Sequence, residues 1–284
     1  MSNSGQVFRA GDSVWNSLWP VSAYQHLLAA AVEHLQHQRE QGQRYVTVDA
    51  AKLAALSRPI ATSGATPVAA DGTGPAAAAA CANLAELRAQ ALACTQCPNL
   101  AAVRKQVVFG VGNESADLMF VGEAPGADED AQGEPFVGKA GQLLTKIIQT
   151  MGLSRDTVYI GNILKCRPDT PGQRYGNRPP TGEEMATCSP WLHRQIELIR
   201  PKVIVALGKT AVEGLLEKQV AITRFRGTWQ TYCGTPLMPT FHPAYLLRNQ
   251  ALTEKRKIWE DMLAVMERLE MPVSEKQRGY FLQG

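Results

Sequence analysis

From about residue 84 onward, the order of apolar and polar positions switches repeatedly between two periods, and each period predicts a type of element. Short apolar, β-branched runs predict strands at 118–121, 158–164, 203–207 and 237–241. Apolar positions at helical spacing predict helices over 138–151, 181–199, 209–216 and 253–269. Strands separated by helices pair in parallel through right-handed crossovers. The pattern therefore predicts an α/β domain, a three-layer α/β/α arrangement around a central, mostly parallel four-stranded sheet. Thr181, followed by Glu184, predicts a capping box at the start of the second helix.

The composition divides the chain into four parts. Residues 57 to 80 contain nine Ala, three Pro and three Gly, so few of their side chains are able to pack, and we expect a flexible linker over 57–83. Before it lies an N-terminal extension, 1–56, which is partly helical and partly disordered by its pattern. The α/β domain spans 84–271, and 272–284 is a C-terminal tail. The extension carries no recognisable chemistry, and we expect it to bind a protein partner.

Overall composition excludes several classes of protein. Hydrophobic residues make up 45% and charged residues 19% of the 284 positions, which is too apolar for a wholly disordered chain. No apolar run approaches the roughly 20 residues that span a bilayer, and the N-terminus lacks the layout of a secretory signal. We therefore expect a cytoplasmic protein that does not contact membranes and that is a monomer.

The net charge of +3 conceals two zones of opposite sign. Residues 86 to 161 hold six Lys/Arg and nine Asp/Glu, whereas residues 162 to 226 hold eleven and six. A basic zone beside an acidic one suits a surface that binds a polyanion next to a pocket with working carboxylates, although a solvated charged face gives the same imbalance.

Polar groups follow each predicted strand, at the edge of the sheet where ligands bind in folds of this class. We expect one crevice to collect the side chains of Glu123, Asp128, Glu129, Asp130, Asn162 and His242. A histidine near carboxylates suits acid/base or electrostatic chemistry, and the alternative is a strand-end histidine that caps its own loop. Phe136 either packs in the core or offers a flat face to a ring.

Four of the six cysteines form a pattern typical of a metal site. Cys94 and Cys97 form a C-x-x-C pair, and Cys166 and Cys188 follow. Without a secretion signal, metal or redox use is favoured over disulfides, with isolated buried cysteines as the alternative. Four thiolates suit either zinc or an iron-sulfur cluster, and ligand softness does not separate the two.

Four longer motifs occur in a fixed order between residues 84 and 270. They are GEAPGADED at 122–130, GEPFVGKAGQLL at 133–144, NILKCRP at 162–168 and HPAYLLRN at 242–249. Together with the cysteine pattern, they resemble the motifs of the family 4 uracil-DNA glycosylases, which belong to the uracil-DNA glycosylase superfamily.

This resemblance implies a DNA repair enzyme that acts in base excision repair. The enzyme flips uracil out of single- or double-stranded DNA and hydrolyses its N-glycosidic bond, which leaves an abasic site. The resemblance also implies a [4Fe-4S] cluster, with a structural role, on Cys94, Cys97, Cys166 and Cys188.

The resemblance further implies roles for individual residues. Gly122, Glu123 and Ala124 line the uracil pocket, Phe136 stacks on the base, and Asn162 binds its pyrimidine edge. Glu129 positions or activates water, because Ala124 stands where the related family 1 enzymes have a catalytic Asp, and His242 stabilises charge on the leaving base. DNA contacts are expected from Tyr245, Leu246, Leu247 and Arg248. They are also expected from an insertion at 169–180, which contains Arg174 and Arg178, together with Arg167 just before it.

Two alternatives remain. One is a relative that binds uracil-containing DNA covalently through a histidine on an extra basic loop, but residues 208 to 227 contain no histidine. The other is a non-catalytic DNA-binding or partner-docking module with a degenerate pocket.

Overall fold

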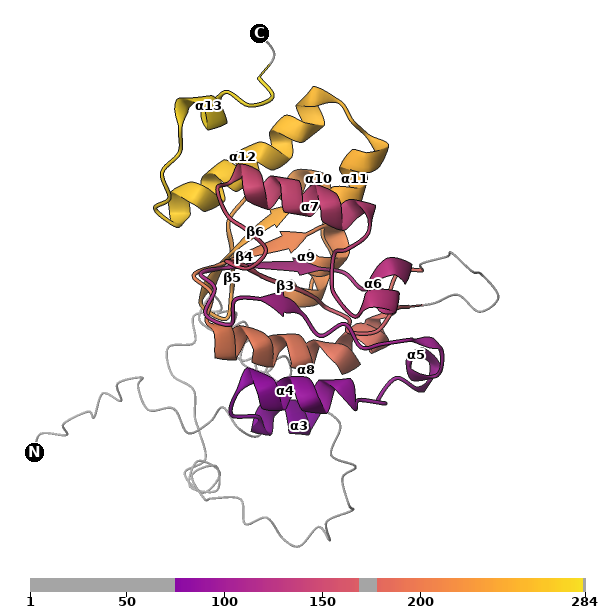
Figure 1. Cartoon of the computed structure of the whole chain (residues 1–284). Helices are drawn as coiled ribbons and strands as arrows, with labels where there is room; N and C mark the ends of the chain where they lie inside the picture. The colour runs from indigo at the N-terminus through magenta and orange to yellow at the C-terminus, as the bar shows by residue number, and fades with distance from the viewer. Residues whose placement is uncertain (1–74, 169–177, 283–284) are drawn as a thin grey trace, which may run out of the picture. The chain divides into compact units, whose positions relative to one another are not determined.

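A six-stranded sheet forms the centre of the part of the chain that the computed structural model describes, residues 75–168 and 178–282 (Figure 1). In the order β1-β3-β2-β4-β6-β5, the strands are β1 (Val111–Gly112), β3 (Tyr159–Asn162), β2 (Leu118–Gly122), β4 (Val203–Leu207), β6 (Thr235–Thr240) and β5 (Gln230–Tyr232). The inner four are parallel to one another, and the edge strands β1 and β5 are antiparallel to their neighbours. The α/β class and the parallel inner strands are confirmed. The expected total of four strands is wrong, because edge strands of two and three residues are too short to show a period.

Helices cover both faces of the sheet (Figure 1). In chain order they are α3 (Pro75–Ala80), α4 (Leu84–Leu92), α5 (Pro98–Val103), α6 (Ala127–Gln132), α7 (Lys139–Thr150), α8 (Gly182–Ile199), α9 (Lys209–Leu216), α10 (Ile222–Phe225), α11 (Pro243–Arg248), α12 (Leu252–Arg268) and α13 (Glu275–Arg278). None of these described helices has the length and apolar composition needed to cross a membrane.

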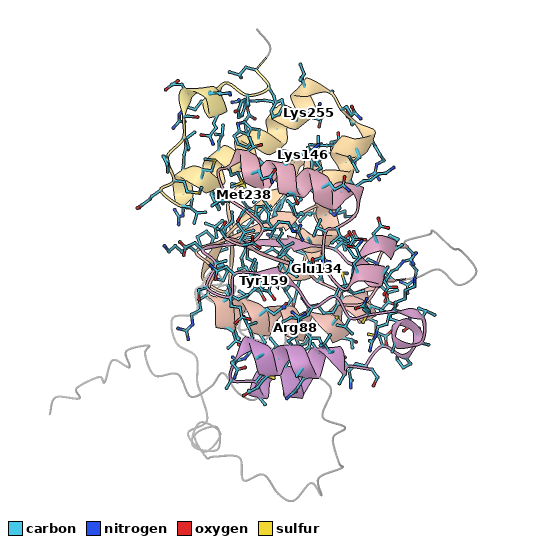
Figure 2. The ribbon with its side chains drawn as sticks, in the orientation of Figure 1. Arg88, Glu134, Lys146, Tyr159, Met238 and Lys255 are labelled. Carbon is cyan, nitrogen blue, oxygen red and sulfur yellow. The ribbon has the colours of Figure 1, made fainter. Side chains whose placement is uncertain are left out.

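The two faces of β2 show how the strands specify two hydrophobic cores. Met119 and Val121 point into the core shared with α4, α8 and α9, whereas Leu118 and Phe120 point into the core shared with α7 and α12. Figure 2 shows the result, with Arg88 of α4 on one side of the sheet and Lys146 and Lys255 on the other. All five residues of β2 are buried, as expected for a parallel strand covered on both faces.

The longer helices agree with the expected ranges. The expected helix at 138–151 is α7, the one at 181–199 is α8, and the one at 253–269 is α12. The capping box at the start of α8 is confirmed, since Thr181 accepts from the Glu184 N–H and the Glu184 carboxylate accepts from the Thr181 N–H.

The expected linker at 57–83 is wrong over its last residues. Residues 75–80 form α3, in which Ala78 is 1% exposed, and the helix packs against α8. Arg194 of α8 donates two hydrogen bonds to the carbonyl of Cys81, which ties the segment down. Short alanine side chains let two helices approach closely, so the composition that suggested a linker also suits a packed helix. The N-terminal extension and residues 57–74 lie outside the described residues.

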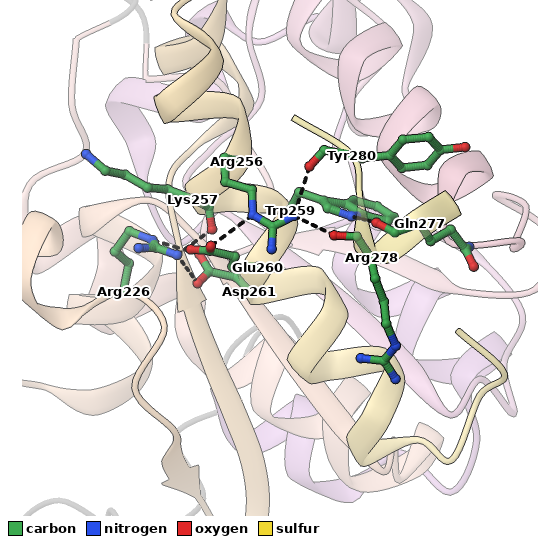
Figure 3. Close-up of polar contacts among 9 residues, drawn as sticks. All are labelled: Arg226, Arg256, Lys257, Trp259, Glu260, Asp261, Gln277, Arg278 and Tyr280. Atoms are coloured by element: carbon green, nitrogen blue, oxygen red, sulfur yellow. Dashed lines mark hydrogen bonds and ion pairs between the residues drawn. The ribbon is translucent and has the colours of Figure 1, made fainter. Parts of the chain in front are cut away.

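The C-terminal tail, expected at 272–284, folds back onto α12 as far as it is described (Figure 3). The Trp259 indole donates to the carbonyl of Gln277 at 2.6 Å, and Arg256 donates to the carbonyls of Arg278 and Tyr280. Gln277 in turn donates to the carbonyl of Thr150 at the end of α7. The tail therefore joins two helices of the same layer.

A buried ion pair fastens α12 to the sheet (Figure 3). The Asp261 carboxylate accepts two hydrogen bonds from Arg226 and one from Thr240, whose hydroxyl lies 2.5 Å away. Burial raises the pKa of Asp261 to about 6, and the hydrogen bonds from Arg226 and Thr240 oppose this rise. Thr240 ends β6, so the pair fixes the strand from which His242 follows.

Removing the charge of Asp261 tests this role. The Asp261→Asn substitution leaves Arg226 without its anion. The Arg226 side chain is only 15% exposed, so we expect a loss of about 3–5 kcal/mol in the free energy of unfolding, measured in urea. Glu260→Gln is the matched control on the same helix, because Glu260 is half exposed and its pair with Arg256 is worth less than about 1 kcal/mol. Equal losses in the two variants would contradict the assignment.

Candidate active site

The ends of β2 and β3 bring together the first three residues of the site. Parallel pairing sets Gly122 opposite Asn162. A Cβ atom on Gly122 would lie 2.4 Å from the Asn162 Oδ1 and 2.5 Å from the Phe136 ring. Glycine is therefore required at 122, because any side chain would occupy the space that these two groups enclose.

The Asn162 side chain faces this space with an unused acceptor. Asn162 is 2% exposed, and its Oδ1 is buried without a hydrogen-bond partner among the described residues. An unsatisfied buried acceptor costs about 1–3 kcal/mol, so its presence needs an explanation. A ligand that donates to Oδ1 supplies one.

Phe136 is held in position through its backbone. Its φ of 56° lies in the left-handed region, which is unusual for an aromatic residue. Arg155 donates to the carbonyls of Pro135 at 2.7 Å and Phe136 at 3.1 Å, and a Cβ on Gly141 would overlap the Phe136 carbonyl. Burial lowers the pKa of Arg155. No pattern in the sequence signalled Arg155, because the carbonyls that it binds lie 19 and 20 residues away.

Glu129 fastens the same loop to α6. Its carboxylate accepts three backbone hydrogen bonds at 3.0 Å, from Gly126 before the helix and from Val137 and Gly138 beyond Phe136. An ionised carboxylate offers about four acceptor sites, so one is left for another donor. Glu129 is thus an anchor of the Phe136 loop, a role that sequence reasoning missed.

His242 faces the Phe136 ring, with the ring centroids 5.7 Å apart. Its Nδ1 accepts a hydrogen bond from the Ala244 N–H at 3.1 Å, so the neutral imidazole carries its proton on Nε2. Burial and the charge of Arg248 lower its pKa to about 4, while Glu129 opposes this shift. The ring both caps its own helix, as the alternative interpretation held, and presents a neutral N–H donor.

A cavity of about 330 Å³ opens beside His242. It is lined by Glu123, Ala124, Pro125, Pro168, Arg178, His242, Ala244 and Arg248. Two arginines and a carboxylate at the opening suit an anionic ligand that carries a polar ring. Arg178 also forms an ion pair with Glu184 at the start of α8, whereas Arg174 lies outside the described residues.

The four residues expected to contact DNA all lie on α11, but they face different surroundings. Leu247 is 41% exposed and Arg248 is exposed. Leu246 is 6% exposed and packs with Phe241 and Ile258 in a small core cluster, so it does not reach the surface as the sequence suggested. The Tyr245 hydroxyl donates to Glu254 at 3.0 Å, which directs it toward α12.

The four cysteines of the expected ligand set converge on one region of the core. Cys166 and Cys188 are buried in the core that α8 covers, and Cys94 and Cys97 pack against it. Burial and the neighbouring thiols of Cys166 and Cys94 raise the pKa of Cys97 to about 11. Burial raises the pKa of Cys188 to about 12, with Cys166 and Cys97 adding to the rise. Thiols that oppose each other's ionisation are those that a shared cation would deprotonate.

Hydrogen-bond donors surround these sulfur atoms. Arg104 donates to the Cys166 Sγ at 3.1 Å, and the Lys165 N–H donates to the Cys188 Sγ at 3.2 Å. Among the described residues, no three His, Cys, Asp or Glu side chains come close enough to hold a single metal ion.

Asp130 connects the cysteine region to α6. It is buried, and its carboxylate accepts from the N–H groups of Lys105 and Gln106, which follow Arg104. Arg104 itself donates to the Cys94 carbonyl at 2.6 Å. Sequence reasoning placed Asp130 with the working carboxylates, but its partners make it a structural anchor next to Glu129.

Comparisons with known proteins identify a consistent set of relatives. The family model described as uracil DNA glycosylase superfamily matches residues 109–263. A type-4 uracil-DNA glycosylase of Thermotoga maritima is 47% identical over 171 residues, which cover 60% of this chain and 85% of that protein. The type-4 uracil-DNA glycosylase of Saccharolobus solfataricus is 43% identical, covering 62% and 82%. A type-5 uracil-DNA glycosylase of Pyrobaculum aerophilum is 32% identical, covering 55% and 80%.

The protonation state of His242 is directly measurable. We expect ¹⁵N NMR, with the signals assigned by a His242→Gln variant, to show a neutral ring with its proton on Nε2 and a pKa of about 4. The unfolded chain takes up this proton near pH 6.5, so it binds more protons than the folded chain between pH 6.5 and 4. The contribution of His242 to the free energy of unfolding therefore falls as the pH drops through this window. A midpoint near 6.5 in the folded protein would contradict the geometry.

Proposed function

The chain belongs to the family 4 uracil-DNA glycosylases of the uracil-DNA glycosylase superfamily, and on that premise we propose that it hydrolyses the N-glycosidic bond of uracil in DNA. One observation carries this proposal: the unpaired Oδ1 of Asn162 lies at the end of β3 beside the Phe136 ring and Gly122. An aromatic face next to a free amide acceptor is what a flipped pyrimidine requires.

Asn162 reads the pyrimidine edge of the base. Uracil carries an N–H between two carbonyl groups, and the carboxamide offers an acceptor for that N–H and a donor for the neighbouring carbonyl. Phe136 stacks on the flipped ring, and this contact offsets part of the few kcal/mol lost on unstacking. Gly122, Glu123 and Ala124 form the wall of the pocket, and Gly122 leaves the base room to approach Asn162.

His242 stabilises the leaving base. Cleavage places negative charge on uracil, and a preorganised donor aimed at a uracil carbonyl favours that transition state over the ground state. The Nε2–H of a neutral imidazole is such a donor, since Nδ1 is occupied by the Ala244 N–H. A neutral donor does not need to lose a proton before the next turnover.

Glu129 acts at the sugar. The deoxyribose becomes positively charged as the bond breaks, so a carboxylate near it stabilises the transition state, and its remaining acceptor site orients the attacking water. Its three backbone hydrogen bonds hold the carboxylate in place. Replacing Glu129 therefore disturbs both the water and the Phe136 loop, which makes it a poor choice as a sole test of catalysis.

Leu247 and Arg248 contact the DNA around the flipped nucleotide. Leu247 is exposed and precedes Arg248, which lines the cavity, so the leucine suits insertion into the vacated stack and Arg248 suits a phosphate. Leu246 is left out of this role because it is part of the core.

Cys94, Cys97, Cys166 and Cys188 would hold a [4Fe-4S] cluster. Bound there, the cluster supplies a cross-link between the segment before β1, the end of β3 and α8, and no step of the hydrolysis passes through it. Three expectations stay predictions: that the enzyme is cytoplasmic, that it is a monomer, and that the N-terminal extension binds a protein partner.

The test of this function is release of uracil from a labelled oligonucleotide, scored by strand cleavage after alkali. We expect release by the wild type and a loss of about 100-fold in kcat/KM for Gly122→Ala, because its methyl group displaces the base or Asn162 by about 1 Å. Gly161→Ala is the matched control on β3, where the nearest atoms to an added Cβ are 3.7 Å away and the rate is expected to stay near wild type.

Other outcomes identify the alternatives. A heat-stable protein–DNA adduct in place of free uracil would favour the covalent relative. Binding to uracil-containing DNA with neither adduct nor release would favour the non-catalytic module. Equal rates for Gly122→Ala and the wild type would place the base elsewhere.

The role of Arg248 is tested by the salt dependence of binding to uracil-containing duplex DNA. Losing one phosphate contact is expected to reduce the slope of log K against log [salt] by about 0.9 in Arg248→Ala. Lys202→Ala is the control, since Lys202 is 68% exposed at the opposite end of the sheet, paired with Asp117. Identical slopes for Arg248→Ala and the wild type would rule out this contact.

A further inference from the structure

Lys165 is a buried cation for which the catalytic proposal has no use. It is 1% exposed and stands between Asn162 and Cys166. Its ammonium group donates to the Asn162 carbonyl at 3.0 Å and to the Gln195 Oε1 at 2.5 Å. It also lies 5.9 Å from the centre of the Phe109 ring.

The orientation of Gln195 is set by other groups. The Gln195 amide donates to the Phe109 carbonyl and to the Tyr159 hydroxyl, both at 2.9 Å. With its N–H groups used in this way, its oxygen is turned toward Lys165. Gln195 is completely buried, so this arrangement is a preformed receptor for an ammonium group.

This receptor is neutral, and that leaves the charge uncompensated. Among the ion pairs of the described residues, none places a carboxylate on Lys165. A buried ammonium without an anion costs several kcal/mol, and carbonyl oxygens and an aromatic face recover only part of that. A counter-charge is therefore expected nearby.

Two cysteines of the ligand set adjoin Lys165. Cys166 directly follows Lys165 along the chain. The backbone N–H of Lys165 itself donates to the Cys188 Sγ at 3.2 Å. Four thiolates around a [4Fe-4S] core leave the whole centre negatively charged, which is the charge that Lys165 lacks.

We propose that Lys165 is a positioning residue that couples the cluster to uracil recognition: its ammonium group is the counter-charge of the cluster thiolates and at the same time fixes the backbone carbonyl of Asn162. This inference rests on the cluster in the proposed function. It gives the cluster a part in binding the base that requires neither contact with DNA nor a change of oxidation state.

The first measurement is the reduction potential of the cluster in the purified holoprotein, by spectroelectrochemical titration. Lys165→Met removes the charge, and Gln195→Glu neutralises it with a new carboxylate. Both are expected to shift the potential to more negative values, because a lost or compensated positive charge makes an added electron less favourable. Lys202→Met, a change of an exposed lysine, is expected to leave the potential unchanged.

The second measurement separates positioning from charge. Lys165→Met loses the bond to the Asn162 carbonyl, so kcat/KM for uracil release is expected to fall by about tenfold or more. Gln195→Glu keeps the ammonium group and that bond but loses the donor to the Phe109 carbonyl, so its kcat/KM is expected to fall less than that of Lys165→Met although its potential shifts. A general folding defect would lower cluster content and activity together in both variants.

The outcomes are distinguishable from failure of the proposed function. A wild-type protein without iron and sulfide overturns the cluster, and with it this inference. A cluster whose potential responds to neither variant overturns the counter-charge role and leaves the glycosylase proposal standing. If Lys165→Met does not retain its cluster, the potential of Gln195→Glu tests the counter-charge role. Lys165→Arg keeps the positive charge and is expected to retain the wild-type potential.

Discussion

The parallel pairing of β2 with β3 is the constraint on which the site depends, because it sets Gly122 directly beside Asn162. A shift of one residue in this register would turn the Asn162 side chain to the other face of the sheet. Both strands are buried on both faces, so apolar packing against two helical layers fixes the register strongly. The loop that carries Phe136 then places its ring beside Gly122 and Asn162, which the two strands already hold in position.

Hydrogen bonds between charged side chains and backbone groups close that loop. Glu129 gathers three N–H groups, Arg155 gathers two carbonyls, and Asp130 holds the segment that continues from Arg104. A charge that is partly or fully removed from water and satisfied by backbone groups is costly to displace, so these contacts make the site rigid. Lys165 differs, because no ion pair of the described residues gives it a carboxylate, and the cluster thiolates supply the negative charge in its place.

Much of the architecture followed from periodicity alone. The parallel strands and helices α7, α8 and α12 are long enough for apolar spacing to be legible, and their ends carry local signals such as Thr181 and Glu184. The short elements could not be predicted from apolar spacing. The edge strand β1 has two residues, and α3 is a run of alanines whose burial depends on the partner helix α8. A pattern within such a segment cannot reveal a surface that is supplied from elsewhere in the chain.

The sequence by itself determined that Asn162 and His242 lie at one edge of the sheet, since each comes at the end of a strand and parallel strands end on the same side. It also determined the family, because several long motifs occur in one order. The tertiary structure decided what these residues do. Asp130 and Glu129 bind backbone N–H groups, and Leu246 packs in a core cluster. Arg155 and Lys165, which no sequence pattern singled out, bind backbone carbonyls at the site. The reason is physical. The role of a polar side chain depends on which backbone groups and charges lie within about 3 Å of it, and those come from distant parts of the chain.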